Sequence, residues 1–130
     1  MSTPLMIKTG WLLFAHGARD PEWARPFEAV AARMRVERPT DSIRLAYLEF
    51  MDPALNQAAD ALAAEGCTRI EVVPLFLGAG GHVRRDVPPL LDAVRARYPQ
   101  VSLRLHPAVG VHDEVITGMA RAALALGDSR

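Results

Sequence analysis

Two histidines and one glutamate directly follow apolar or glycine-rich segments of the sequence. Side chains of these types can bind a metal ion. His16 precedes Gly17 after an apolar run, His82 follows the glycine-rich segment 78–81, and Glu49 ends another apolar run. Paired neutral imidazoles with a carboxylate nearby suit Co, Ni, Fe or Zn ions. Imidazole also titrates near neutrality, so it can accept a proton. The three residues therefore indicate a site that binds a divalent metal and removes protons.

Each of these residues also has a purely structural interpretation. His16 could be partly buried and bonded to a loop carbonyl, and His82 could cap a helix. Glu49 could be a solvated residue at the end of a strand. We expect His106 and His112 to be helix caps or surface residues. The combination of two histidines with a carboxylate favours function for His16, His82 and Glu49.

A second set of residues near the same points could anchor an anionic ligand. Glycine N–H groups at the start of a helix attract anions, and arginine binds carboxylates. The alternative is that these arginines are solvated or paired with neighbouring aspartates. The candidates are Arg19, Gly80, Gly81, Arg84 and Arg85.

Alternating strand and helix patterns predict the scaffold that positions these residues. Apolar, β-leaning segments cover 11–15, 43–48, 70–77 and 101–105, and helical spacing covers 27–36, 54–64, 87–98 and 114–126. Pro74 predicts that the third strand ends, or has a bulge, near it. The alternation predicts an α/β fold: a three-layer sandwich with a four-stranded parallel sheet flanked by helices.

This fold would bring the candidate residues to one edge. Ligands of open α/β sheets bind outside the carboxyl ends of the strands. All four histidines and Glu49 follow the predicted strands at that edge.

Length and composition exclude several classes of protein. The 130 residues predict one domain over 1–130. Lys+Arg and Asp+Glu are 15 each, so no basic excess supports nucleic-acid binding. We expect no membrane segment, because no apolar run approaches about 20 residues, and no secretory signal in residues 1–10. The single cysteine, Cys67, favours a reducing cytoplasm and excludes a thiolate zinc site.

Motifs of other enzyme classes do not occur in the sequence. It contains no phosphate-binding G-x-x-x-x-G-K-[ST] loop and no G-x-S-x-G nucleophile elbow, and segment 78–81 does not match G-x-G-x-x-G. A phosphohistidine enzyme based on His16 is a remote alternative. Histidine phosphatases have arginine before the histidine, and Ala15 stands here.

Four short motifs together resemble the short-form sirohydrochlorin cobaltochelatase family. They are H-G-A-R-D-P at 16–21, A-Y-L-E at 46–49, V-P-L-F-L at 73–77, and G-H-V at 81–83 with D-V-P at 86–88. The resemblance covers roughly His16 to Gly110. Ala18 replaces the family's usual serine, and the histidine-rich tract of some relatives is absent.

The resemblance implies a class II chelatase, which inserts a divalent metal into sirohydrochlorin without ATP. By position, His16 and His82 would be the active-site histidines and metal ligands, and Glu49 the assisting carboxylate. The metal substrate would be Co²⁺, or Fe²⁺ or Ni²⁺, with no tightly bound cofactor. Larger relatives contain two such domains facing a cleft, so this chain would be one half-domain that works as a homodimer.

Several alternatives stay open at this point. Cobalt insertion for cobalamin is the first interpretation, and iron insertion for sirohaem or nickel insertion would use the same residues. A non-catalytic carrier of tetrapyrrole or metal is a different class. The residue that takes the protons, among His16, His82 and Glu49, is also open.

Overall fold

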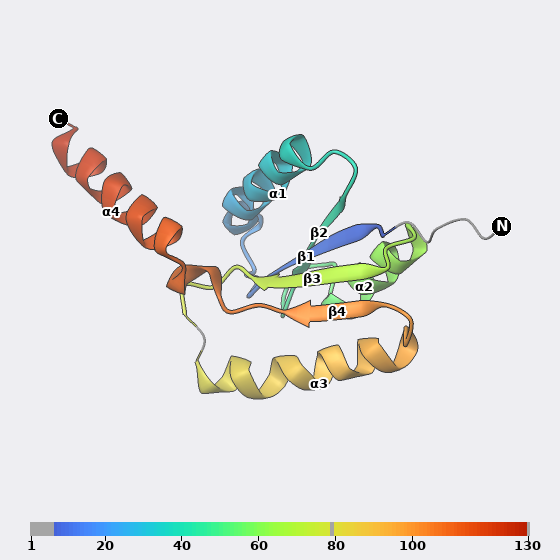
Figure 1. Ribbon diagram of the computed structural model, residues 1–130. Helices are drawn as coiled ribbons and strands as arrows, with labels where there is room; N and C mark the ends of the chain where they lie inside the picture. Colours follow the sequence, from blue (N-terminus) through green and yellow to red (C-terminus); the bar gives the residue numbers. More distant parts are fainter. Residues whose placement is uncertain (1–6, 79, 130) are drawn as a thin grey trace.

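The computed structural model describes residues 7–78 and 80–129, and it contains one four-stranded parallel sheet. The strand order is β2-β1-β3-β4, as Figure 1 shows. The strands are β1 (Thr9–Ala15), β2 (Ser42–Tyr47), β3 (Arg69–Pro74) and β4 (Ser102–Leu105). Phe14 of β1 pairs with Ala46 of β2 on one side and with Pro74 of β3 on the other. The carboxyl ends of these three strands therefore lie level with one another, and the predicted parallel α/β fold is confirmed.

Helices cover both faces of the sheet. The regular helices are α1 (Arg25–Glu37), α2 (Leu55–Ala64), α3 (Gly81–Arg97) and α4 (Asp113–Asp128), and the short 3-10 turns are η1 (Pro21–Ala24) and η2 (Val109–Val111). Helices α2 and α3 share the larger core with one face of the sheet, and α1 packs over β1 and β2 on the other face. Among the described residues, no helix is both long and apolar enough to cross a bilayer.

Side-chain alternation along β1 divides the core between the two faces. Leu12 and Phe14 point into the cluster with α2 and α3, whereas Leu13 points toward Ala31 of α1. All four are at most 1% exposed. Successive residues of a strand face opposite sides, so an almost continuous apolar run is what a strand between two layers requires.

The third helix begins six residues before the predicted segment 87–98. It starts at Gly81 and contains Pro88 and Pro89, which sequence reasoning treats as signs of a boundary. Both prolines are exposed, while four apolar residues at i, i+4, i+8 and i+11 from Val83 to Val94 are buried. Packing of that buried face outweighs the backbone bonds lost at the prolines. The strand before it ends at Pro74, as that residue predicted.

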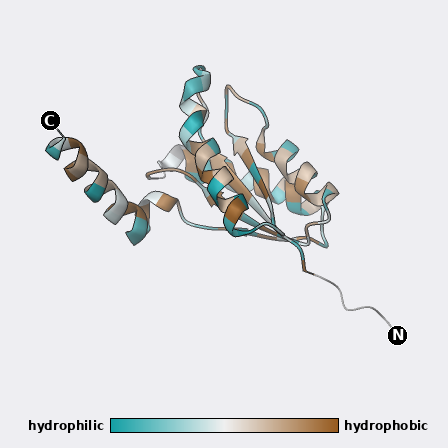
Figure 2. Cartoon of the chain, turned by 90° about the horizontal axis from the view of Figure 1, so that it is seen from above, coloured by the Kyte–Doolittle hydropathy of each residue, from teal (hydrophilic) through white to brown (hydrophobic). Residues whose placement is uncertain are grey.

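Helix α4 departs from the layered arrangement. It extends away from the sheet in Figure 1, and Figure 2 shows the same helix standing clear of the body from above. Its contacts are chiefly with η2, which immediately precedes it. Within the described part of the chain, no residue of α4 is buried.

Candidate functional site

The ends of β1 and β2 bring His16 and Glu49 together through their backbones. The N–H of Leu48 donates to the carbonyl of Ala15 at 2.9 Å, and the N–H of Glu49 donates to the carbonyl of His16 at 3.0 Å. The parallel hydrogen-bond pattern thus continues beyond the last strand residues. His16 and Glu49 are therefore held side by side at the carboxyl edge, and both are exposed.

Gly17 is required by this close approach of the two strand ends. Its φ is +91°, which L side chains rarely adopt. A Cβ at this position would lie 1.9 Å from the carbonyl oxygen of Glu49. The glycine after His16 therefore lets the chain turn directly against the segment that carries Glu49.

The third strand contributes a platform for the His16 ring. Phe76, two residues beyond β3, packs against His16 with ring centroids 4.2 Å apart and planes inclined by 30°. Phe76 is 2% exposed and also contacts Phe14 of β1. Contact with a fixed aromatic ring restricts the orientation of the imidazole. Sequence analysis did not single out Phe76, although it lies within the V-P-L-F-L motif.

Arg19 lies at the same edge, beside the segment that carries Glu49. Its guanidinium carbon is 4.9 Å from the centre of the Phe50 ring. Phe50 has a φ of +67° and is 57% exposed. Asp20, the suggested partner of Arg19, instead accepts a hydrogen bond from the N–H of Glu22 at 3.0 Å and caps η1. Arg19 thus presents a cation beside the candidate site.

The glycine-rich segment leads into the N-terminus of α3. Gly80 is the N-cap of this helix and Gly81 its first residue. Among the described residues, nothing lies within 4 Å of a Cβ built on either glycine. The backbone places His82 in the first turn of α3, but its side chain lies outside the described residues. The predicted pairing of His16 with His82 therefore stays a prediction.

Arg84 and Arg85 lie on the first turns of α3 and are exposed. The Nε of Arg85 donates to the carbonyl of Gly81 at 3.3 Å, which holds the side chain near the start of the helix. Arg84 and Phe76 both line a mainly apolar hollow of about 230 Å³ between α3 and the segment after β4. The predicted basic residues thus lie along the same edge of the fold.

Of the remaining two histidines, His112 caps a helix, as one of its expected roles, whereas His106 pairs with a buried carboxylate rather than capping a helix or lying free on the surface. The Nδ1 of His112 accepts a hydrogen bond from the N–H of Glu114 at 3.2 Å and caps α4. The Nε2 of His106 lies 2.5 Å from the carboxylate of Glu71. Among the described residues, no three or more His, Cys, Asp or Glu side chains form a cluster that could hold a metal.

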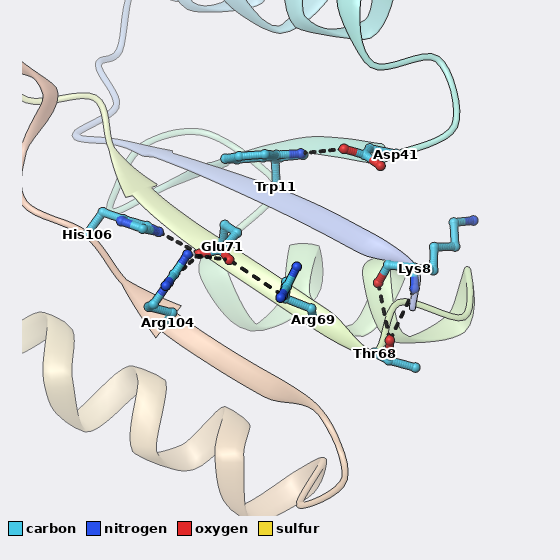
Figure 3. A network of polar contacts seen from close by, with 8 residues as sticks. All are labelled: Lys8, Trp11, Asp41, Thr68, Arg69, Glu71, Arg104 and His106. Carbon is cyan, nitrogen blue, oxygen red and sulfur yellow. Dashed lines mark hydrogen bonds and ion pairs between the residues drawn. The ribbon is translucent and has the colours of Figure 1, made fainter. Parts of the chain in front are cut away.

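Glu71 is a buried charge that sequence analysis did not identify. It is 4% exposed, and Arg104 donates two hydrogen bonds to it at 2.9 and 3.0 Å, as Figure 3 shows. The Nε of Arg69 lies 3.9 Å from an oxygen of the same carboxylate. Burial raises the pKa of Glu71, but hydrogen bonds from Arg104 and His106 bring that pKa below its ordinary value. The sequence did contain a sign of this buried charge, because Glu71 is a charged residue within the otherwise apolar strand segment 70–77.

Comparison with known proteins decides the family. The profile of the CbiX family matches residues 10–124 of the chain. The chain belongs to the CbiX family. The match includes every site residue discussed above, and it confirms the resemblance seen in the sequence motifs.

The curated relatives that match this chain include a short and a longer protein. A sirohydrochlorin cobaltochelatase of Sulfurisphaera tokodaii is 31% identical over 106 residues, covering 82% of this chain and 83% of the relative. A sirohydrochlorin ferrochelatase of Priestia megaterium is 30% identical over 105 residues. The chain covers only 40% of the length of that ferrochelatase.

Solved structures of the CbiX family and its relatives have the same fold. A CbiX protein from Marinobacter aquaeolei VT8 superposes with a TM-score of 0.81 at 29% identity, covering 94% of this chain and 99% of the other. SirB from Bacillus subtilis with Fe³⁺ gives a TM-score of 0.80 at 25% identity. The alignment covers 93% of this chain but 48% of SirB.

Proposed function

We propose that this protein inserts a divalent metal, cobalt in the first place, into sirohydrochlorin without ATP. The observation that carries the proposal is the coupling of His16 to Glu49 at the carboxyl edge of a CbiX-family sheet. The family's relatives include cobaltochelatases and ferrochelatases with this substrate in their names. Iron is the second candidate metal, because the Priestia megaterium relative is a ferrochelatase.

His16 is proposed as a transient metal ligand. Insertion exchanges the water shell of the ion for ring nitrogens, so the protein ligand must release the metal again. A neutral imidazole binds first-row ions without the softness of a thiolate. The Phe76 ring packs against the imidazole of His16 and orients it, and the His16 side chain remains exposed to an incoming macrocycle. His82 is proposed as the second histidine ligand, from the start of α3.

Glu49 is proposed to accept protons during insertion. Two N–H groups of the macrocycle lose their protons when the metal binds, and a positioned base must receive them. The backbone hydrogen bond from the N–H of Glu49 to the carbonyl of His16 keeps the two residues adjacent, within reach of the same bound macrocycle. His16 and His82 are the alternative proton acceptors.

The anionic substituents of the macrocycle would meet the basic residues of this edge. Arg19 lies beside Phe50, and Arg84 and Arg85 lie on the first turns of α3. The N–H groups of Gly80 and Gly81 at the helix start would add to this attraction. The described residues leave room at both glycines, so a ligand could approach their backbone closely.

Two copies are proposed to form the working unit. The alignment with SirB covers nearly all of this chain and about half of SirB, so a second copy would supply the facing half. The proposed location is the cytoplasm, supported by the free thiol of the buried Cys67.

The test is anaerobic incubation of the purified protein with sirohydrochlorin and Co²⁺, Fe²⁺ or Ni²⁺ in turn. Metal insertion is followed by the visible spectrum of the macrocycle. We expect acceleration over the uncatalysed rate, which His16→Ala, His82→Ala and Glu49→Gln each reduce strongly. The control His112→Asn retains a helix-capping side chain and is expected to retain insertion.

The outcomes separate the candidate functions. A faster rate with iron than with cobalt would make the protein a ferrochelatase. Binding of the macrocycle without acceleration by any metal would overturn the enzyme and favour a carrier. Full activity of His16→Ala would remove His16 from the mechanism.

A further inference from the structure

Phe50 is an aromatic residue whose place in the fold does not explain its type. Among the phenylalanine, tyrosine and tryptophan side chains of the described residues, that of Phe50 alone is exposed. Its neighbours Leu48 and Met51 are partly buried against the core clusters. The φ of Phe50 is +67°, where glycine, asparagine or aspartate is more usual, because other L residues adopt this conformation at a cost. Neither burial nor the backbone therefore favours phenylalanine at this position.

The loop that carries Phe50 is held in place on both sides of it. The N–H of Tyr47 donates to the carbonyl of Pro53 at 2.9 Å, which closes the segment between these two residues. The N–H of Glu49 donates to the carbonyl of His16, which joins the same loop to the end of β1. Phe50 thus projects from a backbone that is already fixed. A ligand that packs on its ring has little loop ordering to offset.

A cation from the neighbouring segment lies against the Phe50 ring. The guanidinium carbon of Arg19 is 4.9 Å from the ring centre, within the range of a cation–π contact. Both side chains are exposed, so an aromatic surface and a positive charge stand next to each other. An aromatic ring packs on conjugated rings, and a guanidinium binds carboxylates. The pair therefore suits a ligand that has a flat conjugated system with carboxylate substituents.

The order of the strands sets the width of a ligand that can use this pair. Phe50 follows β2, His16 follows β1, and α3 follows β3. Because β1 lies between β2 and β3, the segments that carry Phe50 and the start of α3 leave the sheet on either side of His16. Strands β2 and β3 are two strand spacings apart, roughly 10 Å. A ligand that contacts Phe50 and the first turn of α3 together must therefore be wide, as a tetrapyrrole is.

We propose that Phe50 is a stacking platform for the tetrapyrrole, with Arg19 binding one of the carboxylates of the same ligand. The inference rests on the proposed function, since it names sirohydrochlorin as the ligand. Phe50 binds and orients the macrocycle, and it takes no part in metal or proton transfer. Because Phe50 adjoins Glu49, a macrocycle packed on its ring is held beside the proposed proton acceptor.

The test measures binding of metal-free sirohydrochlorin to the purified full-length protein under anaerobic conditions, by the fluorescence anisotropy of the macrocycle. Phe50→Leu keeps an apolar side chain but removes the ring, so the dissociation constant is expected to rise roughly three- to tenfold. Phe50→Trp restores an aromatic surface and should bind within about twofold of the unmodified protein. In the insertion assay, Phe50→Leu should raise KM and leave kcat nearly unchanged, because stacking contributes equally to ground-state and transition-state binding.

Val36→Ala is the matched control for loss of exposed apolar surface. Val36 is 81% exposed and lies near the end of α1, which leads to the start of β2 at the opposite edge of the sheet. Its substitution is expected to leave both the dissociation constant and insertion unchanged.

Phe50→Gly separates a role in binding from a role in folding. Glycine adopts a positive φ without the cost that phenylalanine bears, so the melting temperature should stay the same or rise. The dissociation constant of the macrocycle should rise at least as much as in Phe50→Leu. A melting temperature lowered by several degrees would assign the ring to folding and overturn the proposal.

The outcomes also separate this inference from the proposed function. Normal insertion by the unmodified protein, with an unchanged dissociation constant in Phe50→Leu, would overturn the stacking platform alone. An unmodified protein that neither binds sirohydrochlorin nor accelerates insertion would overturn the proposed function and the platform together.

Discussion

Gly17→Ala is the sharpest test of how the fold builds the site. The substitution adds one methyl group between the ends of β1 and β2, where the backbones of His16 and Glu49 are joined. The added Cβ would lie 1.9 Å from the Glu49 carbonyl oxygen, and ordinary contact begins near 3.4 Å. The two segments must therefore move apart by about 1.5 Å.

The expected cost has two parts. A left-handed backbone costs a non-glycine residue about 1–2 kcal/mol. Separation of the segments also breaks the 3.0 Å hydrogen bond between Glu49 and His16, which contributes about 1 kcal/mol. Because a misplacement of about 1 Å can cost 10²-fold in rate, we expect metal insertion to fall by roughly that factor. The protein should remain folded, with a free energy of unfolding lower by about 2–3 kcal/mol.

Gly66→Ala is the matched control for the backbone strain. Gly66 has a φ of +87°, but among the described residues nothing lies within 4 Å of its Cβ position. This variant should lose about 1–2 kcal/mol of stability and retain its insertion rate. Chemical denaturation and the insertion assay measure the two quantities separately. Equal insertion rates for Gly17→Ala and Gly66→Ala would refute the idea that close contact of the strand ends positions the site.

Three further substitutions test other parts of the structure. Glu71→Gln should lower the free energy of unfolding by about 2 kcal/mol near pH 7, because Arg104 loses a charged acceptor. Since the pKa of Glu71 is lowered in the folded state, this difference should shrink as the pH falls below about 4.5, as urea titrations at several pH values can show. Phe76→Leu removes the aromatic ring that packs against His16, a ring–ring contact worth about 0.5–1.5 kcal/mol. Metal insertion should therefore slow by up to about tenfold, while the melting temperature falls by only a few degrees. In Gly81→Ala the new Cβ meets no atom of the described residues, and alanine is the better helix residue, so melting should stay the same or rise slightly. The KM for sirohydrochlorin should nevertheless rise several-fold if the substrate approaches this backbone.

The parallel sheet could be predicted because its signal is local and repeated. Apolar runs and helical spacing fixed the order of the elements, and Pro74 predicted the end of β3. The position of His16 and Glu49 at one edge followed from the rule that parallel strands share their carboxyl ends. These predictions need only local sequence patterns and the common direction of the parallel strands, and not the packing of side chains from distant segments.

Other features depend on packing between distant segments. The contact of His16 with Phe76 requires the register of β1 and β3, which no local pattern contains. The burial of Glu71 becomes acceptable only when Arg104 and His106, from the next strand and its exit, surround it. The early start of α3 likewise depends on a buried face that outweighs its prolines. In each case a tertiary contact overrides what the local sequence favours.

The glycines of the proposed site are of two kinds: Gly17 is required by the fold, whereas Gly80 and Gly81 are not explained by contacts of the described residues. The fold requires glycine at position 17, because the φ of this residue and its close contact with Glu49 leave no room for a side chain. Among the described residues, no atom lies within 4 Å of a Cβ built on Gly80 or Gly81, and neither glycine has a φ in the left-handed region. The contacts of the described residues therefore give no reason for glycine at these two positions, although glycine in a helix start costs stability. A requirement from outside the chain, such as close approach of a large anionic ligand to the first turn of α3, would supply that reason. On this argument, one side of the proposed site is rigid and prearranged around His16, and the other is shaped by what binds there.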